Sequence, residues 1–402
     1  MGGIVIVGAG QAGASLAARL RALGYSGAVT LIGEEPQPPY QRPPLSKAYL
    51  LGEMELERLY LRAPSFWAEQ GVTLRLGTQV EALDTAAQTL RLAGGETLFY
   101  DELALTTGSR PRRLPAGIGG DLANVFTVRT LADVDCMAPA FRPGARALIV
   151  GGGYIGLEAA AVAAKLGLEV TLIEAAPRIL QRVAAAETAD YFRRLHQAHG
   201  VRVLEGTGLA RLAGAGKVAG AVLADGTELP ADLVIVGIGI LPDTDLAEAA
   251  GIALENGIRA DELGRTSAPH VWAAGDCASF PHGDIRIRLE SVGNAIDMAE
   301  TVAANMLGAA APYHAKPWFW SDQYDVKLQI AGLNTGYDRI VTRPGDGGAL
   351  SVWYYRGATL LALDAMNDAR AYMIGKRLIE AGRSPDPALI ADPATDLKAL
   401  LK

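Results

Sequence analysis

Two stretches of the chain share one order of apolar, glycine-rich and helix-forming positions. The first stretch opens with the apolar run Ile4–Val7, passes through Gly8–Gly13 into the alanine- and leucine-rich segment Ala14–Leu23, and returns to an apolar run at Val29–Ile32. Short apolar runs bounded by glycine are typical of buried strands, and the segment between them favours a helix that ends at Gly24. This order predicts a strand, a tight turn, a helix and a second strand.

The same order returns in the middle of the chain. An apolar run at Ala145–Val150 leads through Gly151–Gly156 into a second helix-forming segment, and Val170–Ile173 follows as the next strand. Both copies have glycine at the spacing G-x-G-x-x-G, and an acid, Glu34 or Glu174, stands at the end of each second strand. One such fingerprint is weak evidence, but two copies in the same local context predict two dinucleotide-binding units.

The glycines of this fingerprint have separate physical roles. The first permits the tight turn, the second lets the backbone approach a pyrophosphate, and the third lets helix and strand pack closely. The N-terminus of the helix then faces the phosphates with unpaired N–H groups, and the acid accepts hydrogen bonds from a ribose. Two copies imply two nucleotides, and FAD and NAD(P)H are the natural pair because hydride passes between them. The predicted contacts are Gly8, Gly10, Ala12, Gly13 and Glu34 for FAD, and Gly151, Gly153, Tyr154, Ile155, Gly156 and Glu174 for the nicotinamide cofactor.

The second acid bears on the choice between NADH and NADPH. Glu174 would bond the 2′-hydroxyl of NADH and repel the 2′-phosphate of NADPH. No adjacent arginine pair follows it, although Arg178 and Arg182 are close enough in sequence to leave use of NADPH open. The pattern favours NADH.

Composition and charge narrow the class of protein further. The chain has 402 residues and a net charge of −7, which argues against nucleic acid as the main partner. No apolar run approaches the length of a membrane span, and no basic segment typical of a signal peptide precedes Ile4. The two cysteines, Cys136 and Cys277, form no C-x-x-C pair, so a reducing, cytoplasmic setting is expected.

Four further motifs point to a family. They are Tyr40–Lys47, Leu105–Pro111, Ala273–Cys277 and Trp318–Gln323. With the two fingerprints, they resemble the FAD-dependent, NADH-linked ferredoxin reductases of bacterial cytochrome P450 and ring-hydroxylating dioxygenase systems, the putidaredoxin reductase-like family. The first and last motifs are highly specific, whereas the middle two are shared with the wider glutathione-reductase-like superfamily. The resemblance implies an α/β fold with two Rossmann-like dinucleotide-binding domains and a C-terminal α+β domain.

The resemblance also implies residues that contact FAD. Asp276 would hold a ribityl hydroxyl, a role that suits a directional carboxylate acceptor. A helix is expected from Glu290–Asn294 to about Leu307, with Val292 at the flavin ring and the helix dipole stabilising the charge of the reduced flavin. The remaining implied FAD contacts are Arg42, Lys47, Val80, Thr107, Gly108 and Arg129.

Three residues are candidates for the catalytic centre. By resemblance, Lys47 lies near flavin N5 and pairs with Glu158 on the second fingerprint helix, and Pro44 lies against the ring edge. A charged residue opening an otherwise apolar helix needs a partner if it is buried, which favours the pair over a solvated Glu158. The family places Glu158, together with Gly237, on the nicotinamide side.

The redox cysteines that other relatives of this fold use are missing from the sequence. Disulfide-using relatives carry C-x-x-C or C-x4-C, and peroxidase relatives carry a cysteine soon after the first acid; the chain has neither. Electrons must therefore leave FAD directly to an external one-electron carrier, and Cys277 is expected to pack as a core residue. His196 and His199 have metal-binding spacing, but a solvated helix face is favoured and no metal is expected.

The domain plan follows from these assignments. Residues 1–112 and 245–320 are predicted to form the FAD domain, 113–244 the NAD domain, and 321–402 a C-terminal domain of short strands (Leu328–Ala331, Ala349–Tyr355, Thr359–Asp364) and a helix (Ala369–Ala381). The expected partner is an acidic [2Fe-2S] ferredoxin, and indirectly a P450 or Rieske oxygenase, with the chain acting as a monomer. Candidate basic residues for steering it are Arg110, Arg112, Arg113, Lys316, Lys327, Lys376 and Lys398. Glu300 stands at a helix position that is basic in the family members of the camphor system. Trp320 is either a docking or electron-exit residue or a core aromatic.

Two alternative functions stay open at this point. Rubredoxin or monodehydroascorbate reduction would use the same scaffold. An apoptosis-inducing-factor-like signalling flavoprotein would bind partners that include nucleic acid, which the acidic charge disfavours.

Overall fold

The computed structural model describes residues 2–402, and the chain divides into two compact units. The first unit contains the chain up to Arg42, Glu55–Arg110 and Ile240–Pro317; the second contains Pro43–Met54, Pro111–Gly239 and Trp318–Lys402. No helix among residues 2–402 is long and apolar enough to cross a membrane.

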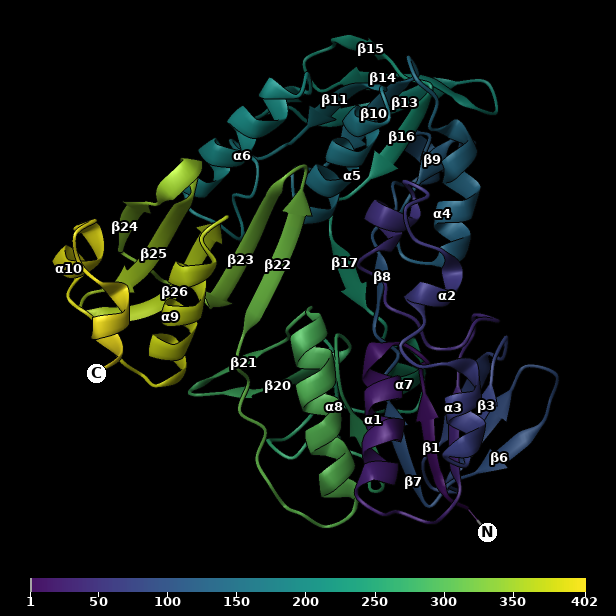
Figure 1. Cartoon of the computed structure of the whole chain (residues 1–402). Coiled ribbons are helices and arrows are strands. Elements are labelled where there is room, and N and C mark those ends of the chain that lie inside the picture. Colours follow the sequence, from purple (N-terminus) through teal and green to yellow (C-terminus); the bar gives the residue numbers. More distant parts are fainter. Residues whose placement is uncertain (1) are drawn as a thin grey trace. The chain divides into compact units, whose positions relative to one another are not determined.

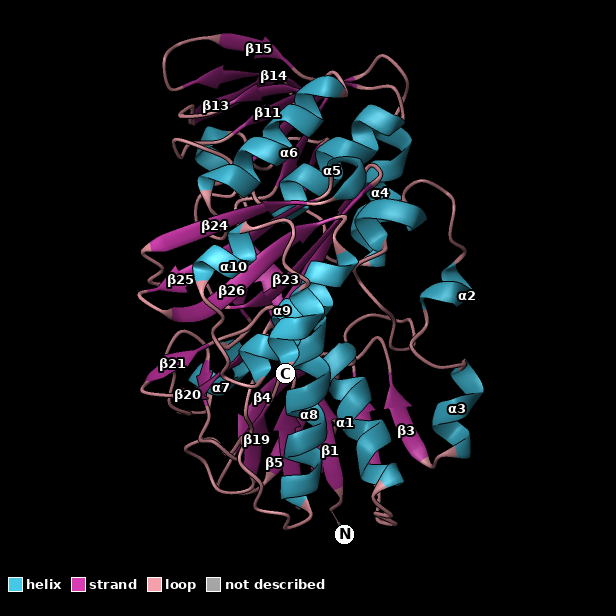
Figure 2. Ribbon diagram, turned by 60° about the vertical axis from the view of Figure 1, so that its left-hand side comes forward, coloured by secondary structure: helices cyan, strands magenta, loops and turns pink. Residues whose placement is uncertain are grey.

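The first unit is built on a five-stranded parallel sheet in the order β19-β7-β1-β2-β3. Its strands are β1 (Ile4–Val7), β2 (Val29–Ile32), β3 (Val72–Arg75), β7 (Glu102–Leu105) and β19 (Val271–Ala273). Strand β1 is buried at every position, as its continuous apolar run predicts for a central parallel strand. Helices α1 (Gln11–Ala22) and α8 (Val292–Met306) pack side by side, so a C-terminal segment of this unit covers the first fingerprint helix (Figure 2).

Smaller elements complete the first unit. The strands are β4 (Val80–Asp84), β5 (Thr89–Leu92), β6 (Thr97–Phe99), β17 (Ile240–Pro242), β18 (Ile258–Arg259), β20 (Ala278–His282), β21 (Ile285–Ile287) and β8 (Ser109–Pro111), whose last residue is counted with the second unit. The helices are α2 (Leu56–Leu59), α3 (Pro64–Glu69) and α7 (Asp245–Ala249).

The second unit repeats the parallel sheet in the order β12-β11-β10-β16-β9. Its strands are β9 (Val125–Phe126), β10 (Arg146–Val150), β11 (Glu169–Ile173), β12 (Arg202–Leu204) and β16 (Leu233–Val236). The helices are α4 (Leu131–Met137), α5 (Tyr154–Lys165) and α6 (Ala186–Ala198), with short 3₁₀ turns at Ala116–Ile118 and Ala138–Ala140. A three-stranded antiparallel sheet follows, of β13 (Leu209–Gly214), β14 (Val218–Leu223) and β15 (Glu228–Pro230).

The C-terminal part of the second unit is an antiparallel sheet in the order β22-β23-β26-β25-β24, with α9 packed against β23 and β26 (Figure 1). Its strands are β22 (Trp318–Gln323), β23 (Val326–Gly332), β24 (Arg339–Pro344), β25 (Leu350–Arg356) and β26 (Thr359–Met366). The helices are α9 (Ala369–Glu380) and α10 (Pro387–Ala391), with 3₁₀ turns at Asp346–Gly348 and Leu397–Leu401. The fold class expected from the sequence, two Rossmann-like units and an α+β C-terminal part, is therefore confirmed.

The units differ from the expected domain plan at segment 43–54 and in the C-terminal part, and the boundaries expected after residues 112 and 244 lie a few residues earlier. Segment 43–54 belongs to the second unit, because Leu45 and Ser46 are buried there and Tyr49 donates a hydrogen bond to Asp135. The expected boundary after Trp320 falls inside β22, whose continuous pairing with β23 starts at Trp318. Side chains of β10, α5 and α6 share one hydrophobic core with those of β23, β25 and β26, so the C-terminal sheet completes the second unit.

Candidate active site

The first fingerprint forms a tight turn between β1 and α1. Gly8 has φ +112°, and a Cβ there would lie 2.1 Å from the carbonyl oxygen of Thr106. A Cβ on Gly13 would lie 2.0 Å from the carbonyl oxygen of Gly8. Both glycines are therefore required by the protein itself, the first by its backbone conformation and the other by close packing.

The second fingerprint repeats this geometry. Gly151 has φ +108°, and a Cβ there would lie 2.4 Å from the carbonyl oxygen of Gly237. A Cβ on Gly156 would lie 2.0 Å from the carbonyl oxygen of Gly151. Gly237 in turn passes close to α5, since its own Cβ would lie 3.3 Å from the Gly156 nitrogen.

The middle glycine of each copy is different, because no described residue requires it. A Cβ on Gly10 or Gly153 would meet no atom of residues 2–402 within 4 Å, and neither residue has a positive φ. Both residues are helix N-caps without a side-chain hydrogen bond to the first turn, whereas Thr130 and Asp368 cap α4 and α9. Open space before uncapped N–H groups fits a phosphate, so both turns fit the dinucleotides expected from the sequence.

The first acid lies among other charged groups of the first unit. Desolvation, followed by the nearby carboxylates of Asp243 and Glu35, raises the pKa of Glu34. Glu35 accepts a hydrogen bond from Arg42 at 2.6 Å and another from Tyr40 at 2.5 Å. The expected contact residue Arg42 is thus held beside the end of β2 by an ion pair.

The structure brings Asp276 to the first fingerprint. Gly275 has φ +83°, and a Cβ on it would lie 2.9 Å from the Ala12 side chain on α1. The Ser109 hydroxyl donates to Asp276 at 3.0 Å, and the Thr107 hydroxyl donates to the carbonyl of Asp243 at 2.6 Å. Motifs far apart in sequence therefore meet at the carboxyl edge of the first parallel sheet, where ligands bind in such folds.

The second acid organises the turn of its own fingerprint. Glu174 accepts hydrogen bonds from the Gly152 N–H at 2.7 Å and the Ala176 N–H at 2.8 Å. Arg178 donates to the Ala184 carbonyl at 2.8 Å, so its guanidinium is occupied within the loop after β11. Arg182 is exposed and approaches Gly239, as does Arg112.

Lys47 and Glu158 form an ion pair within the second unit. Lys47 Nζ lies 2.9 Å from Glu158 Oε1, and only 16% and 5% of the two side chains are exposed. Lys47 interrupts the π-helical turn Leu45–Tyr49 with φ −129° and ψ −108°, and Pro44 begins this turn by accepting hydrogen bonds from the Lys47 and Tyr49 N–H groups. The pairing expected from the sequence is present, and the interrupted turn positions the lysine.

Burial raises the pKa of the Glu158 carboxyl. Lys47 and the Ser321 hydroxyl oppose this rise, and the Asp322 carboxylate adds to it. The Ser321 hydroxyl donates to Glu158 Oε1 at 2.7 Å, and Asp322 lies 4.0 Å from Lys47 Nζ. The acid is therefore a buried charge with a cation and a hydroxyl as its partners.

Ser321 and Gln323 were not identified as site residues from the sequence. They lie two residues apart on the buried face of β22, and both are 0% exposed. Polar residues at alternate, inward positions of a strand are a signal that could have marked them, because buried polar groups need partners. Trp318 and Trp320 occupy the alternate positions, stack at 5.5 Å between ring centroids, and are half-buried.

The expectation that His196 belongs to a solvated helix face is wrong. His196 is 0% exposed, its Nε2 lies 2.8 Å from Gln323 Oε1, and its Nδ1 lies 3.1 Å from the Tyr324 hydroxyl. The reason is that β22 covers this side of α6, which helical spacing alone could not reveal; His199 is exposed as expected. No group of three or more His, Cys, Asp or Glu side chains among residues 2–402 could hold a metal ion.

The cysteine after Asp276 is a core residue. Cys277 is buried and its thiol donates to the Leu105 and Ala274 carbonyls, so it packs as expected, and burial raises its pKa.

The Tyr154 ring lies 5.0 Å from the Phe319 ring between centroids, and the buried Tyr154 hydroxyl has no hydrogen-bond partner among the described residues. Val80 begins β4, Arg129 precedes α4, Val292 begins α8 and Gly108 has φ +75°; Ile155 is 45% exposed on α5.

Comparison with known proteins agrees with this geometry. The pyridine nucleotide-disulphide oxidoreductase model matches residues 2–299, and the reductase C-terminal model matches 318–401. The chain therefore belongs to the pyridine nucleotide-disulphide oxidoreductase family.

Within this family the similarity to ferredoxin reductases runs from end to end. A ferredoxin–NAD(P)(+) reductase from Sphingomonas sp. is 46% identical over 98% of this chain and 96% of its own, and putidaredoxin reductase from Pseudomonas putida is 42% identical over 99% and 96%. The crystal structure of a covalent putidaredoxin reductase–putidaredoxin complex matches with a TM-score of 0.96 and 41% identity, covering 100% of this chain and 98% of that chain. The family implies FAD and NAD(P)H as cofactors.

Proposed function

We propose that this protein is an NADH-dependent ferredoxin reductase, which takes hydride from NADH and passes single electrons to a [2Fe-2S] ferredoxin that serves a P450 or ring-hydroxylating oxygenase. The observation that carries the proposal is the pair of fingerprint turns, each with an open middle glycine and an uncapped helix N-terminus. Two phosphate-binding turns suit one flavin and one nicotinamide dinucleotide. The relatives named above act on ferredoxins, which supports the choice of partner.

FAD is assigned to the first unit. Gly10 and the N-terminus of α1 would bind its phosphates, Glu34 its ribose, and Asp276 its ribityl chain. When bound, FAD would supply the chemistry of accepting one hydride, which carries two electrons, and of releasing these electrons one at a time. The other proposed contacts of FAD are Arg42, Lys47, Val80, Thr107, Gly108, Arg129 and Val292.

NADH is assigned to the second unit. Gly153, Tyr154 and Ile155 would meet its phosphates at the N-terminus of α5, and Glu174 would face the adenosine ribose. Arg178 is occupied by backbone carbonyls, which leaves Arg182 as the exposed arginine of this loop. The carboxylate and the occupied arginine together favour NADH over NADPH.

The Lys47–Glu158 pair is proposed to hold the reacting ends of the cofactors. Lys47 would donate a hydrogen bond near flavin N5, with Pro44 against the ring edge and Glu158 on the nicotinamide side. Glu158 keeps the ammonium in one place, because a buried carboxylate 2.9 Å away fixes its position. Positioning of this kind is a large part of hydride-transfer catalysis.

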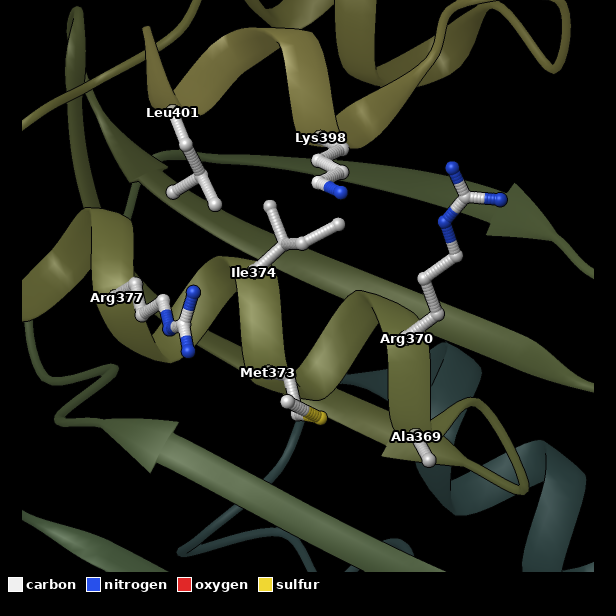
Figure 3. A pocket seen from close by; sticks show the side chains of 7 residues that line it. All are labelled: Ala369, Arg370, Met373, Ile374, Arg377, Lys398 and Leu401. Atoms are coloured by element: carbon white, nitrogen blue, oxygen red, sulfur yellow. The ribbon is translucent and has the colours of Figure 1, made fainter.

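The partner surface is proposed to include α9 and the C-terminal 3₁₀ turn. Arg377, Lys398 and Met373, which is 55% exposed, line a hollow of about 370 Å³, and Arg370 at the same hollow is paired with Asp396 at 2.5 Å (Figure 3). Basic side chains around an exposed apolar residue suit an acidic protein partner. Arg110, from the earlier set of steering residues, is instead paired with Asp245 at 2.6 Å.

Trp320 is proposed as a residue of electron exit or of partner docking. It is half-buried and stacked on Trp318, over whose ring Lys376 Nζ lies at 5.9 Å from the centroid. Both roles considered for this residue are compatible with this position, because one ring face is packed and the residue is still partly exposed. A cytoplasmic location is proposed because both cysteines are free, and the monomeric state remains a prediction.

One experiment tests the main proposal. The purified flavoprotein is reduced without oxygen by NADH or NADPH, and then mixed with a [2Fe-2S] ferredoxin, rubredoxin or monodehydroascorbate. Bleaching of the flavin by NADH, followed by reoxidation with the ferredoxin, is expected. Faster bleaching by NADPH would overturn the nicotinamide assignment. Reoxidation by rubredoxin alone would overturn the partner assignment, and no electron transfer to any carrier would favour a signalling flavoprotein.

A further inference from the structure

A chain of hydrogen bonds connects Glu158 with His196 inside the second unit. The Ser321 hydroxyl lies 2.7 Å from Glu158 Oε1, Gln323 Nε2 lies 3.1 Å from Ser321 Oγ, and His196 Nε2 lies 2.8 Å from Gln323 Oε1. The Tyr324 hydroxyl closes the chain 3.1 Å from His196 Nδ1. The chain thus joins α5, β22 and α6 through side chains alone.

The chemistry of the groups allows one direction for these bonds. An ionised Glu158 only accepts, so Ser321 donates its single proton to it and accepts from the Gln323 amide N–H. The amide oxygen then accepts from His196 Nε2–H, which leaves His196 Nδ1 to accept from the Tyr324 hydroxyl. Every donor therefore points toward Glu158, and each bond polarises the next one.

The middle of this chain is fully enclosed. Ser321, Gln323 and His196 are each 0% exposed, so any of them without a partner would carry the cost of an unsatisfied buried polar group. Burial lowers the pKa of His196 to about 4, with the Gln323 bond opposing and His199 adding to the decrease. The imidazole is therefore neutral near pH 7, which leaves Nδ1 able to accept a hydrogen bond.

Tyr324 reaches His196 from a strained turn. It lies between β22 and β23 with φ +56°, a left-handed conformation that favours glycine or asparagine. Its ring stacks on His199 with 3.7 Å between the centroids, and its hydroxyl bonds His196. These two contacts offset the backbone strain, so the turn places a phenol where a smaller residue would fit the backbone better.

We propose that Ser321, Gln323 and His196 are positioning residues that orient Glu158 and stabilise its charged form, so that Lys47 stays fixed for hydride transfer. This inference rests on the proposed role of the Lys47–Glu158 pair. A primary amide accepts through one atom and donates through another, so the chain transmits orientation and polarisation without carrying a proton. The charged groups that also face Glu158 are Lys47 and Asp322.

The test follows the protonation of Glu158 by infrared pH titration of the holoenzyme, with Glu158→Gln identifying its carboxyl band. Ser321→Ala removes the hydroxyl that donates to Glu158. It is expected to raise the midpoint of the Glu158 titration by about one pKa unit. His196→Leu removes the distant donor and is expected to raise it by roughly half a unit. His196→Gln retains an N–H donor and should restore the midpoint, while the exposed neighbour variant Gln197→Leu should not change it.

A second measurement links the shift to catalysis. The acidic limb of the pH profile for flavin reduction by NADH should move with the infrared midpoint in Ser321→Ala and His196→Leu. Unchanged infrared midpoints in folded Ser321→Ala and His196→Leu would overturn the inference. Ser321→Ala serves alone if His196→Leu does not fold. A wild-type rate of flavin reduction in Glu158→Gln would instead contradict the proposed function of the ion pair, whatever the infrared result.

Discussion

Lys47 Nζ and Glu158 Oε1 lie 2.9 Å apart, and the pair joins the turn at Leu45–Tyr49 to helix α5. The acid is almost completely enclosed, so the lysine is its main compensating charge. A pair of this kind is expected to matter for stability as well as for chemistry, because an uncompensated buried charge is costly.

Replacement of Lys47 by alanine should slow flavin reduction by NADH roughly 100-fold, because the reacting groups lose a positioning contact. It should also lower the free energy of unfolding by about 3–5 kcal/mol, since Glu158 loses its partner. Stopped-flow absorbance and urea unfolding measure the two effects. Lys165→Ala is the matched control, because Lys165 pairs with Glu53 at 2.7 Å while both side chains are more than half exposed. Equal loss of stability in both variants would contradict the prediction.

The glycine geometry separates folding from nucleotide binding. Gly10→Ala should fold with an unchanged melting temperature, because its Cβ meets nothing, but should bind FAD at least roughly tenfold more weakly because the methyl group occupies the phosphate approach. Gly13→Ala should destabilise the protein, because its Cβ would lie 2.0 Å from a carbonyl oxygen. Flavin content after dialysis and thermal unfolding measure these effects. Tight FAD binding by Gly10→Ala would show that the first fingerprint turn does not bind the FAD phosphates.

Gly153 offers the corresponding test of the NADH site. Gly153→Ala should retain FAD and the fold, and should raise the Kd for NADH by roughly tenfold, because its Cβ also points into open space. Titration of the oxidised protein with NAD+ measures binding, with Gly10→Ala as the reciprocal control. Loss of FAD from Gly153→Ala with unchanged NAD+ affinity would reverse the assignment of the two units.

Replacement of Glu174 by glutamine should reduce discrimination against NADPH by roughly tenfold, since the charge that repels a 2′-phosphate is removed. The amide oxygen can still accept one of the two backbone hydrogen bonds, from Gly152 or Ala176, so most of the turn should persist. The ratio of kcat/KM for the two cofactors measures the effect. Glu169→Gln, at the exposed start of β11, is the control and should leave the ratio unchanged.

Asp364 should make the stability of the second unit depend on pH. Burial raises its pKa from 3.8 to about 6, with hydrogen bonds from Tyr354 and Thr188 opposing the rise. The buried, protonated carboxyl adds on the order of 3 kcal/mol to the free energy of unfolding. This stabilisation is complete below about pH 4 and is lost as the pH rises through about 6. Asp364→Asn should flatten this loss in denaturant unfolding between pH 4 and pH 7, whereas the exposed-turn variant Asp284→Asn should retain it. A wild-type pH slope in Asp364→Asn would exclude this carboxyl as the source.

Local sequence patterns determined the two strand–turn–helix units, because each fingerprint encodes its own turn through residues close in sequence. The positions of Gly8, Gly13, Gly151 and Gly156 could be predicted for this reason, as could strand β23 and helix α9 from their periodicity. The Lys47–Glu158 pair was accessible only through resemblance to a family, since nothing local joins these two segments.

Tertiary structure alone decided the surroundings of that pair. Segment 43–54 belongs to the second unit, and strand β22 brings Ser321 and Gln323 from the C-terminal sheet to α5 and α6. Helical spacing placed His196 on an exposed face, yet the strand that covers it lies more than a hundred residues later in the chain. The sequence by itself therefore determined the nucleotide-binding turns, whereas the hydrogen-bond partners of Glu158 depended on long-range packing, because burial is a property of the neighbours and not of the residue.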